Sequence, residues 1–154
     1  MASIRILFMD VDGTMTDGKI YIGENGECMK AFSVHDGYAI ANLLPKNEIL
    51  PVIITGRKSE IVQKRASELG ITEIHQGVKN KLEEMKAIAK KYQVTSENLA
   101  YIGDDLNDLE CMEYCGISAC PADAVDDILT KVDYVCKRTG GQGAVREFID
   151  WILK

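Results

Sequence analysis

Short apolar runs alternate with amphipathic segments along the 154 residues of this chain. Three runs, Ile4 to Met9, Ile49 to Ile54 and Leu99 to Ile102, are almost continuously hydrophobic, which is typical of strands buried on both faces of a parallel sheet. Weaker strand-like segments occur at 73–75, 116–119 and 132–135. The alternation predicts one α/β domain over residues 1–154, with a Rossmann-like parallel sheet flanked by helices.

The segments between these strands show the apolar periodicity of helices, together with residues typical of helix ends. Residues from Lys58 to Leu69 carry apolar side chains on one face, and Gly70 is the expected stop. Asn80 is the expected N-cap of a helix from Lys81 to Tyr92. Further helices are expected from Asp36-Gly37 to about Leu44 with Pro45 as the stop, around Leu109 and Met112, and after the glycine-rich turn 140–143.

Residues 19–32 follow a different pattern. Two short segments flank Asn25-Gly26, the dipeptide favoured in tight β-hairpins. We therefore expect a hairpin there, projecting beside the end of the first strand.

Composition narrows the class of partner. The formal net charge is −6, and no block of lysine or arginine stands out, which argues against nucleic acid. No apolar run reaches the roughly 20 residues of a membrane helix, and the N-terminus lacks a signal-peptide pattern. The five cysteines form no Cys-x-x-Cys, which favours reduced thiols in a cytoplasmic protein and argues against a zinc site.

Polar residues follow the three main apolar runs. Asp10 and Asp12 come after the first run, Thr55 after the second, and Asp104 with Asp105 after the third. Buried unpaired charge is costly, and the carboxyl ends of parallel strands are where open α/β folds assemble their sites. We therefore expect these side chains to meet at one edge of the sheet.

Each of these residues also has a purely structural explanation. Asp12-Gly13 could be only a turn, and Thr55 before glycine could be a helix N-cap. Asp105 and Asp108 could be acidic residues favoured in the first turn of a helix. This last explanation does not account for three aspartates within residues 104–108.

Lys81 adds a cation to the set. A lysine in the first turn of a helix opposes the helix dipole at a cost of about 0.3–1 kcal/mol, so Lys81 is either solvated or faces an anion such as phosphate together with the helix N-terminus. Carboxylates of Asp10 and Asp104 would suit Mg²⁺. Thr55 and Lys81 could stabilise a phosphoryl group attacked by an aspartate, with a second carboxyl acting as general acid and base.

The chain resembles the haloacid dehalogenase superfamily over nearly its whole length. The matching motifs, in order, are Asp10-x-Asp12-Gly13-Thr14, Thr55-Gly56, Lys81, and Gly103-Asp104-Asp105 with Asp108. The resemblance implies Asp10 as the nucleophile that forms an aspartyl-phosphate, and Asp12 as the acid that protonates the leaving oxygen and later activates water. It implies Thr55 and Lys81 at the phosphoryl group. It also implies Mg²⁺ held by the carboxylates of Asp10 and Asp104 and the backbone carbonyl of Asp12.

The spacing of the motifs leaves no room for an inserted cap domain, so the chain is similar to the capless branch. Residues 32–38, 55–58, 76–82 and 140–147 resemble the 3-deoxy-D-manno-octulosonate 8-phosphate phosphatase family. That resemblance implies hydrolysis of a phosphorylated sugar acid by a homotetramer, in which a neighbouring subunit's hairpin and loops close the site. The implied substrate-binding residues are Ser33, Val34, His35, Asp36, Gly37, Arg57, Arg65 and Lys81. The alternatives are a solvated helix residue for Arg65 and an ordinary loop histidine for His35.

Other functions remain open at this point. One is a nine-carbon, sialic-acid-type 9-phosphate phosphatase on the same fold, although Arg57 after Thr55-Gly56 favours the eight-carbon substrate. A second is a non-catalytic assembly module, similar to the domain fused to sialic acid-activating cytidylyltransferases. A third is a phosphoacceptor receiver domain, which the Asp12 general acid and the hairpin disfavour.

Overall fold

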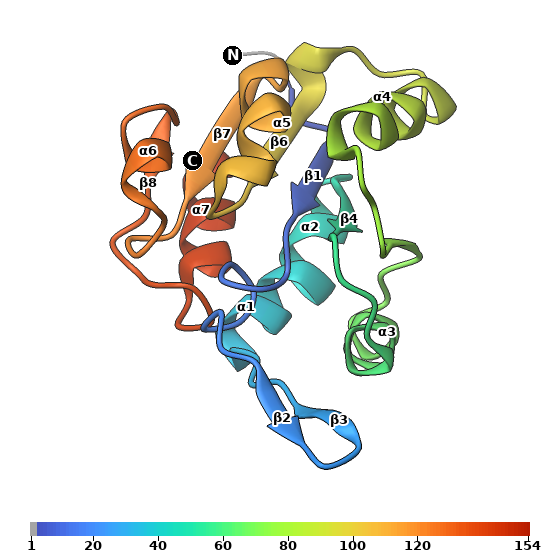
Figure 1. The fold of residues 1–154 in the computed structure, drawn as a ribbon. Coiled ribbons are helices and arrows are strands. Elements are labelled where there is room, and N and C mark those ends of the chain that lie inside the picture. Colours follow the sequence, from blue (N-terminus) through green and yellow to red (C-terminus); the bar gives the residue numbers. More distant parts are fainter. Residues whose placement is uncertain (1–2) are drawn as a thin grey trace.

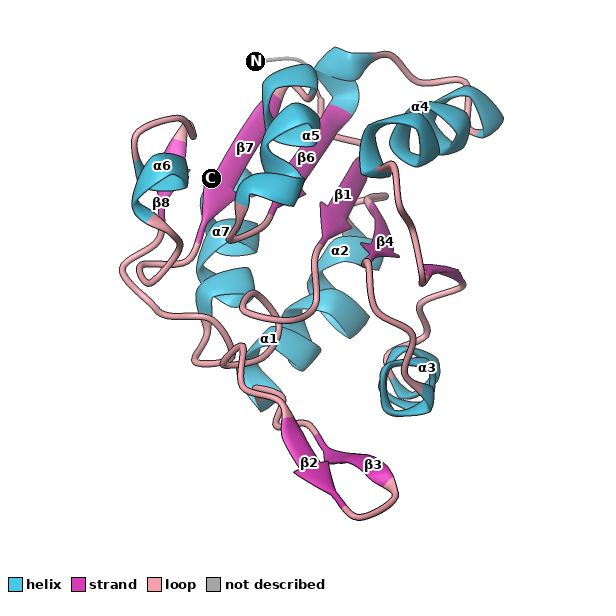
Figure 2. Cartoon of the chain, in the orientation of Figure 1, coloured by secondary structure: helices cyan, strands magenta, loops and turns pink. Residues whose placement is uncertain are grey.

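The computed structural model describes residues 3–154 and shows the predicted α/β arrangement, a parallel sheet with helices on both faces (Figure 1, Figure 2). Within those residues the sheet has the order β5-β4-β1-β6-β7-β8, and each neighbouring pair is parallel. Its strands are Ile6–Met9 (β1), Leu50–Ile54 (β4), Glu73–His75 (β5), Leu99–Ile102 (β6), Ile117–Cys120 (β7) and Tyr134–Val135 (β8).

The two faces of the sheet have separate hydrophobic cores. In β1, Leu7 and Met9 join a core shared with the helical segments 39–44, 60–68 and 144–152, whereas Ile6 and Phe8 join a core shared with the helices at 81–91, 109–114 and 126–129. This alternation follows from the two-residue side-chain period of a strand. The helices are Val34–Tyr38 (α1), Leu44–Lys46 (α2), Glu60–Glu68 (α3), Lys81–Lys91 (α4), Leu109–Tyr114 (α5), Asp126–Leu129 (α6) and Ala144–Ile152 (α7).

The strand order reverses beside β1. The chain runs from β1 outward to β4 and β5, and then returns to the other side of β1 to form β6, β7 and β8. The carboxyl end of β1 therefore lies between those of β4 and β6. In open α/β sheets such a reversal point leaves a crevice, where ligands bind.

The predicted hairpin is present as Tyr21–Gly23 (β2) and Gly26–Met29 (β3), with Gly26 at a positive φ of 105° in the turn. Figure 1 shows the hairpin extending away from the body of the domain, below α1. No helix within residues 3–154 is long and apolar enough to cross a membrane.

The predicted bounds of the helix after the hairpin were wrong. It begins at Val34, where the Ser33 hydroxyl caps the Asp36 N–H, and it continues through Pro45 to Lys46. A π-helical stretch, Ala39–Leu43, precedes the proline. Pro45 lacks an N–H and cannot complete a regular α-helical ladder, and the wider π turn lies in the segment where that ladder would be interrupted.

Candidate active site at the carboxyl end of the sheet

The ends of β1, β4 and β6 enclose a cavity of about 200 Å³. The structure thus brings together the strand-end residues that the sequence singled out. The cavity is lined by Asp10, Asp12, Thr55, Gly56, Arg57, Asp104, Asp105 and Asn107. Asn107 was not among the expected residues.

The loop after β1 passes very close to Asp104. Gly13 has a φ of +87°, and a Cβ atom there would collide with a carboxylate oxygen of Asp104. The backbone N–H groups of Thr14, Met15 and Thr16 all donate to the Val11 carbonyl, which holds the loop in a tight bend. Glycine is needed for both the bend and the close approach. Asp12-Gly13 is therefore a turn, and Asp12 also lines the cavity.

Lys81 is a buried cation in contact with Asp10. Its side chain comes from the first turn of α4, which the Asn80 side chain caps by accepting the Glu83 N–H at 3.1 Å. The Lys81 Nζ atom donates to Asp10 Oδ1 at 3.0 Å and to Asp108 Oδ1 at 2.8 Å. The residue is 5% exposed, which excludes a solvated lysine.

Asp108 is more than a first-turn acidic residue. It is fully buried, and its Oδ1 accepts from Lys81 and from the Tyr101 hydroxyl. Its Oδ2 accepts the backbone N–H groups of Asp104 and Asp105. Sequence reasoning left its role open, because its contact with Lys81, 27 positions away, depends on the fold. The recurrence of aspartate at positions 104, 105 and 108 was the available signal.

Burial dominates the electrostatics of the cavity. Burial and the nearby Asp108 charge raise the pKa of Asp10 well above its usual range, against the lowering effect of Lys81. Burial likewise raises the pKa of Asp104 to about 6. For Lys81, burial acts to lower the pKa, but the charges of Asp10 and Asp108 outweigh it and raise the pKa. Burial thus favours the protonated forms of the Asp10 and Asp104 carboxyl groups.

The carboxyl groups of the cavity fit a hard divalent cation. Asp10, Asp104 and Asp108 each offer an oxygen within 4.8 Å of the others. Asp108 is the poorest ligand of the three, because four donors already occupy its oxygens. Asp10 and Asp104 remain, and two carboxylates beside solvent-accessible space are the donor set that Mg²⁺ takes up at phosphate-processing sites.

The hairpin reaches the cavity through an ion-pair network that sequence reasoning missed. Lys30 donates to Asp12 Oδ1 at 2.5 Å and to Glu27 Oε2 at 3.1 Å. Arg57 donates to the same Glu27 oxygen at 3.3 Å, and its Nε lies 3.9 Å from Asp12 Oδ2. The Lys30 side chain is 1% exposed. The end of the hairpin is thus fixed to the carboxyl group of Asp12.

The remaining expected substrate residues do not line this cavity. Ser33 caps α1, and the buried Asp36 accepts the Arg146 N–H. Arg65 lies over the Phe32 ring at 5.7 Å and donates to Glu68 at 3.3 Å. With its side chain 22% exposed, Arg65 is not a freely solvated helix residue.

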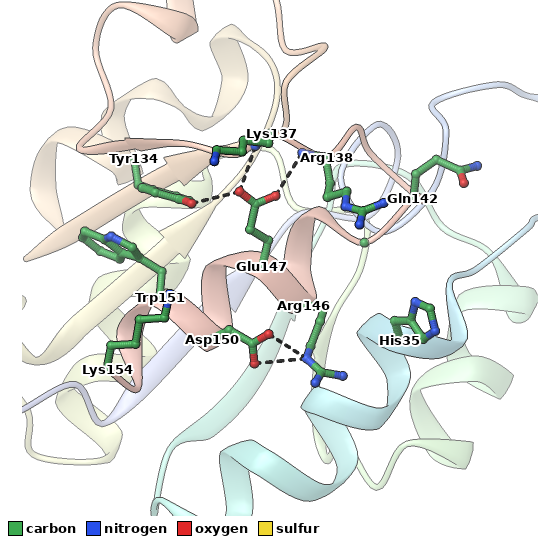
Figure 3. A pocket seen from close by; sticks show the side chains of 11 residues that line it. His35, Tyr134, Lys137, Arg138, Gln142, Arg146, Glu147, Asp150, Trp151 and Lys154 are labelled. Atoms are coloured by element: carbon green, nitrogen blue, oxygen red, sulfur yellow. Dashed lines mark hydrogen bonds and ion pairs between the residues drawn. The ribbon is translucent and has the colours of Figure 1, made fainter.

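His35 lies in a second hollow of about 520 Å³ between α1, α7 and the segment after β8 (Figure 3). Both cations and carboxylates line this hollow. Glu147 accepts from the Tyr134 hydroxyl and from the backbone N–H groups of Lys137 and Arg138. Asp150 is paired with Arg146 at 2.9 Å. The hollow has mixed charge and is separate from the Asp10 cavity.

Comparison with known proteins agrees with this geometry. Residues 58–149 match the haloacid dehalogenase-like hydrolase family. The chain is 47% identical over 151 residues to 3-deoxy-D-manno-octulosonate 8-phosphate phosphatase of Escherichia coli strain K12, covering 98% of this chain and 80% of the relative.

Solved structures show the same fold. The phosphatase of that name from Yersinia pestis has 47% identity and a TM-score of 0.94, covering 97% of this chain and 80% of the other. The Moraxella catarrhalis enzyme, solved with magnesium ion, phosphate ion and a KDO molecule, has 40% identity and a TM-score of 0.93, covering 97% and 86%. The cobalt-bound form of the deoxy-D-mannose-octulosonate 8-phosphate phosphatase from Haemophilus influenzae has 38% identity and a TM-score of 0.93. The match covers 98% of this chain and 88% of the other. This chain therefore belongs to the haloacid dehalogenase-like hydrolases, within the family of 3-deoxy-D-manno-octulosonate 8-phosphate phosphatases.

Proposed function

We propose that this chain is a Mg²⁺-dependent phosphatase that hydrolyses 3-deoxy-D-manno-octulosonate 8-phosphate to the free sugar acid and phosphate. The observation that carries the proposal is the meeting of Asp10, Asp12, Thr55 and Asp104 in one cavity, with Lys81 beneath Asp10. The 47% identity to a phosphatase with this substrate supports the choice of sugar.

In the proposed reaction, an Asp10 carboxylate oxygen attacks phosphorus and the ester P–O bond breaks. Asp12 gives its proton to the departing sugar oxygen. Asp12 then takes a proton from water, whose oxygen attacks the aspartyl-phosphate and releases phosphate and the Asp10 carboxylate. Thr55 and Lys81 would stabilise the phosphoryl group in transit. Mg²⁺, held by Asp10, Asp104 and the Asp12 carbonyl, would neutralise phosphate charge and allow the carboxylates to ionise together.

The substrate residues are proposed to act between subunits of a homotetramer. Ser33, Val34, His35, Asp36, Gly37 and Arg65 do not line the Asp10 cavity of their own chain, so they would meet a sugar bound in a neighbouring subunit, whereas Arg57 lies at its own cavity. The exposed apolar residues Ile22 and Met29 on the hairpin and Val34 and Tyr38 on α1 support such an assembly. Light scattering tests it: a stable monomer would contradict it.

We propose a cytoplasmic location, which the five free cysteines support. Cell fractionation that found the protein elsewhere would contradict this.

A phosphate-release screen decides the substrate. Purified protein with Mg²⁺ is given the eight-carbon 8-phosphate, nine-carbon ulosonate 9-phosphates and simple sugar phosphates. We expect the eight-carbon ester to have the highest kcat/KM and the Asp10→Asn variant to release no phosphate. A preference for a nine-carbon ester would mean that the substrate is a nine-carbon ulosonate 9-phosphate and not the proposed eight-carbon ester. No release from any ester would favour the non-catalytic assembly module.

A further inference from the structure

Tyr101 lies beneath the active site, although the proposed reaction assigns it no role. It is on β6, three residues before Asp104, and it is fully buried. Its ring stacks with that of Phe8 at 6.5 Å between centroids. Its hydroxyl donates to Asp108 Oδ1 at 2.5 Å. A buried tyrosine hydroxyl needs one partner, and this one has taken the carboxylate that also holds Lys81.

The donors and acceptors around Lys81 form a closed set. An ammonium group has three N–H donors. One Lys81 donor goes to Asp10 and one to Asp108, which leaves a single N–H for a phosphoryl oxygen. The acceptor that sets this division is Asp108 Oδ1, which Lys81 and Tyr101 share.

We propose that Tyr101 is a positioning residue, whose hydroxyl holds Asp108 Oδ1 so that Lys81 remains between Asp108 and the nucleophile Asp10. The backbone donors of Asp104 and Asp105 fix the other oxygen of Asp108. The Tyr101 hydroxyl therefore fixes the second oxygen of the Asp108 carboxylate, and its hydrogen bond withdraws part of the negative charge of that oxygen. Without the hydroxyl, Oδ1 attracts Lys81 more strongly, and the ammonium group moves away from Asp10 and the phosphoryl group.

The test uses Tyr101→Phe, which removes the hydroxyl and keeps the ring that stacks on Phe8. The matched control is Tyr134→Phe. Tyr134 also donates its hydroxyl to a carboxylate, Glu147 at 2.8 Å, but in the second hollow and away from Asp10. Both variants lose one hydrogen bond from a tyrosine hydroxyl to a carboxyl group. Comparing their unfolding curves therefore separates a loss of stability from a loss of positioning.

We expect Tyr101→Phe to lower kcat about tenfold, the size of one charge-assisted hydrogen bond, with KM changed less than about twofold. Tyr134→Phe should leave kcat unchanged. If Tyr101 acts through Asp108, adding Tyr101→Phe to Asp108→Asn should cost almost nothing further, because the two changes act on one interaction.

Two results would overturn the proposal. One is a Tyr101→Phe enzyme whose kcat equals that of Tyr134→Phe. The other is a full further loss when Tyr101→Phe is combined with Asp108→Asn, which would mean that Tyr101 acts by another route. The proposal rests on the phosphatase activity, and an unmodified chain without phosphate release would contradict that activity before Tyr101 is tested.

Discussion

Lys30 donates to the Asp12 carboxylate at 2.5 Å, although 18 positions and a whole hairpin turn separate the two residues. This contact connects the projecting hairpin to the residue proposed as general acid and base. Lys30→Gln keeps a hydrogen-bond donor but removes the charge and shortens the side chain. We expect kcat to fall about tenfold, the loss of one charge-assisted hydrogen bond at a reacting group. Steady-state kinetics measures this.

Lys19→Gln is the control for Lys30, since Lys19 precedes the same hairpin and is exposed. It should leave kcat unchanged. Equal activity of the Lys30 variant and the unmodified enzyme would show that the ion pair to Asp12 has no part in the reaction.

Lys81→Met should be inactive and, without metal, clearly less stable. The change leaves the buried Asp10 and Asp108 carboxyl groups without their shared cation. Removing one partner of a buried ion pair typically lowers the free energy of unfolding by about 3–5 kcal/mol. Urea unfolding in EDTA measures the free energy of unfolding. Mg²⁺ should restore part of the loss, because it replaces the missing positive charge.

Lys86→Met, on the same helix, is the comparison for Lys81. Lys86 is exposed, and its Nζ atom is as far as 3.8 Å from Glu83 Oε1. Its replacement should therefore lower the free energy of unfolding by less than about 1 kcal/mol. If both variants unfold at the same urea concentration, the pairing of Lys81 does not stabilise the fold.

Mg²⁺ affinity should fall as the solution becomes acidic. Asp104, with a pKa raised to about 6, and Asp10, with a pKa well above its usual range, hold protons that the metal must displace. Below the pKa of Asp104 the affinity should fall about tenfold per pH unit for each displaced proton. Titration calorimetry over this range measures the affinity. A constant affinity would mean that these two carboxyl groups are not the metal ligands.

Asp36 should make the protein less stable as pH rises. Burial raises its pKa to about 6 from the usual 3.8, so the folded state binds more protons than the unfolded state between these values. Stability from this group is therefore present at low pH and is lost as pH rises through about 6. Asp36→Asn cannot ionise, and its stability relative to the unmodified protein should increase across that window by about 1–3 kcal/mol.

Urea unfolding at a series of pH values tests this, because any constant effect of the new amide cancels in the trend. Asp150→Asn, at a half-buried aspartate of α7 that is paired with Arg146, should show no comparable trend. Parallel pH profiles for Asp36→Asn and the unmodified protein would contradict the expected ionisation of Asp36.

The sheet and the strand-end residues could be predicted because one rule governs both. An apolar run such as Ile6 to Met9 has to be buried, so a carboxylate immediately after it, such as Asp10, has to lie at the edge of the sheet. Asp104 follows its strand in the same way. The Asn80 cap and the Gly70 stop were equally local and were confirmed.

What could not be predicted depends on contacts between distant residues. Pro45 looked like a helix stop, but a π-helical stretch carries the helix through it. Lys30 and Glu27 looked like ordinary hairpin residues until the fold placed them against Asp12 and Arg57. Two partners of Asp108, Lys81 and Tyr101, come from α4 and β6, and the pattern of residues 104–108 does not indicate them.

The separate origins of Asp10, Thr55, Lys81 and Asp104 have a practical consequence. They follow or begin four different elements, β1, β4, α4 and β6, so no single helix or strand, and no pair of consecutive elements, contains all four. Catalytic turnover therefore reports on the integrity of the whole sheet. During denaturation, enzyme activity should disappear together with the circular dichroism signal, and turnover can serve as a sensitive assay of refolding yield.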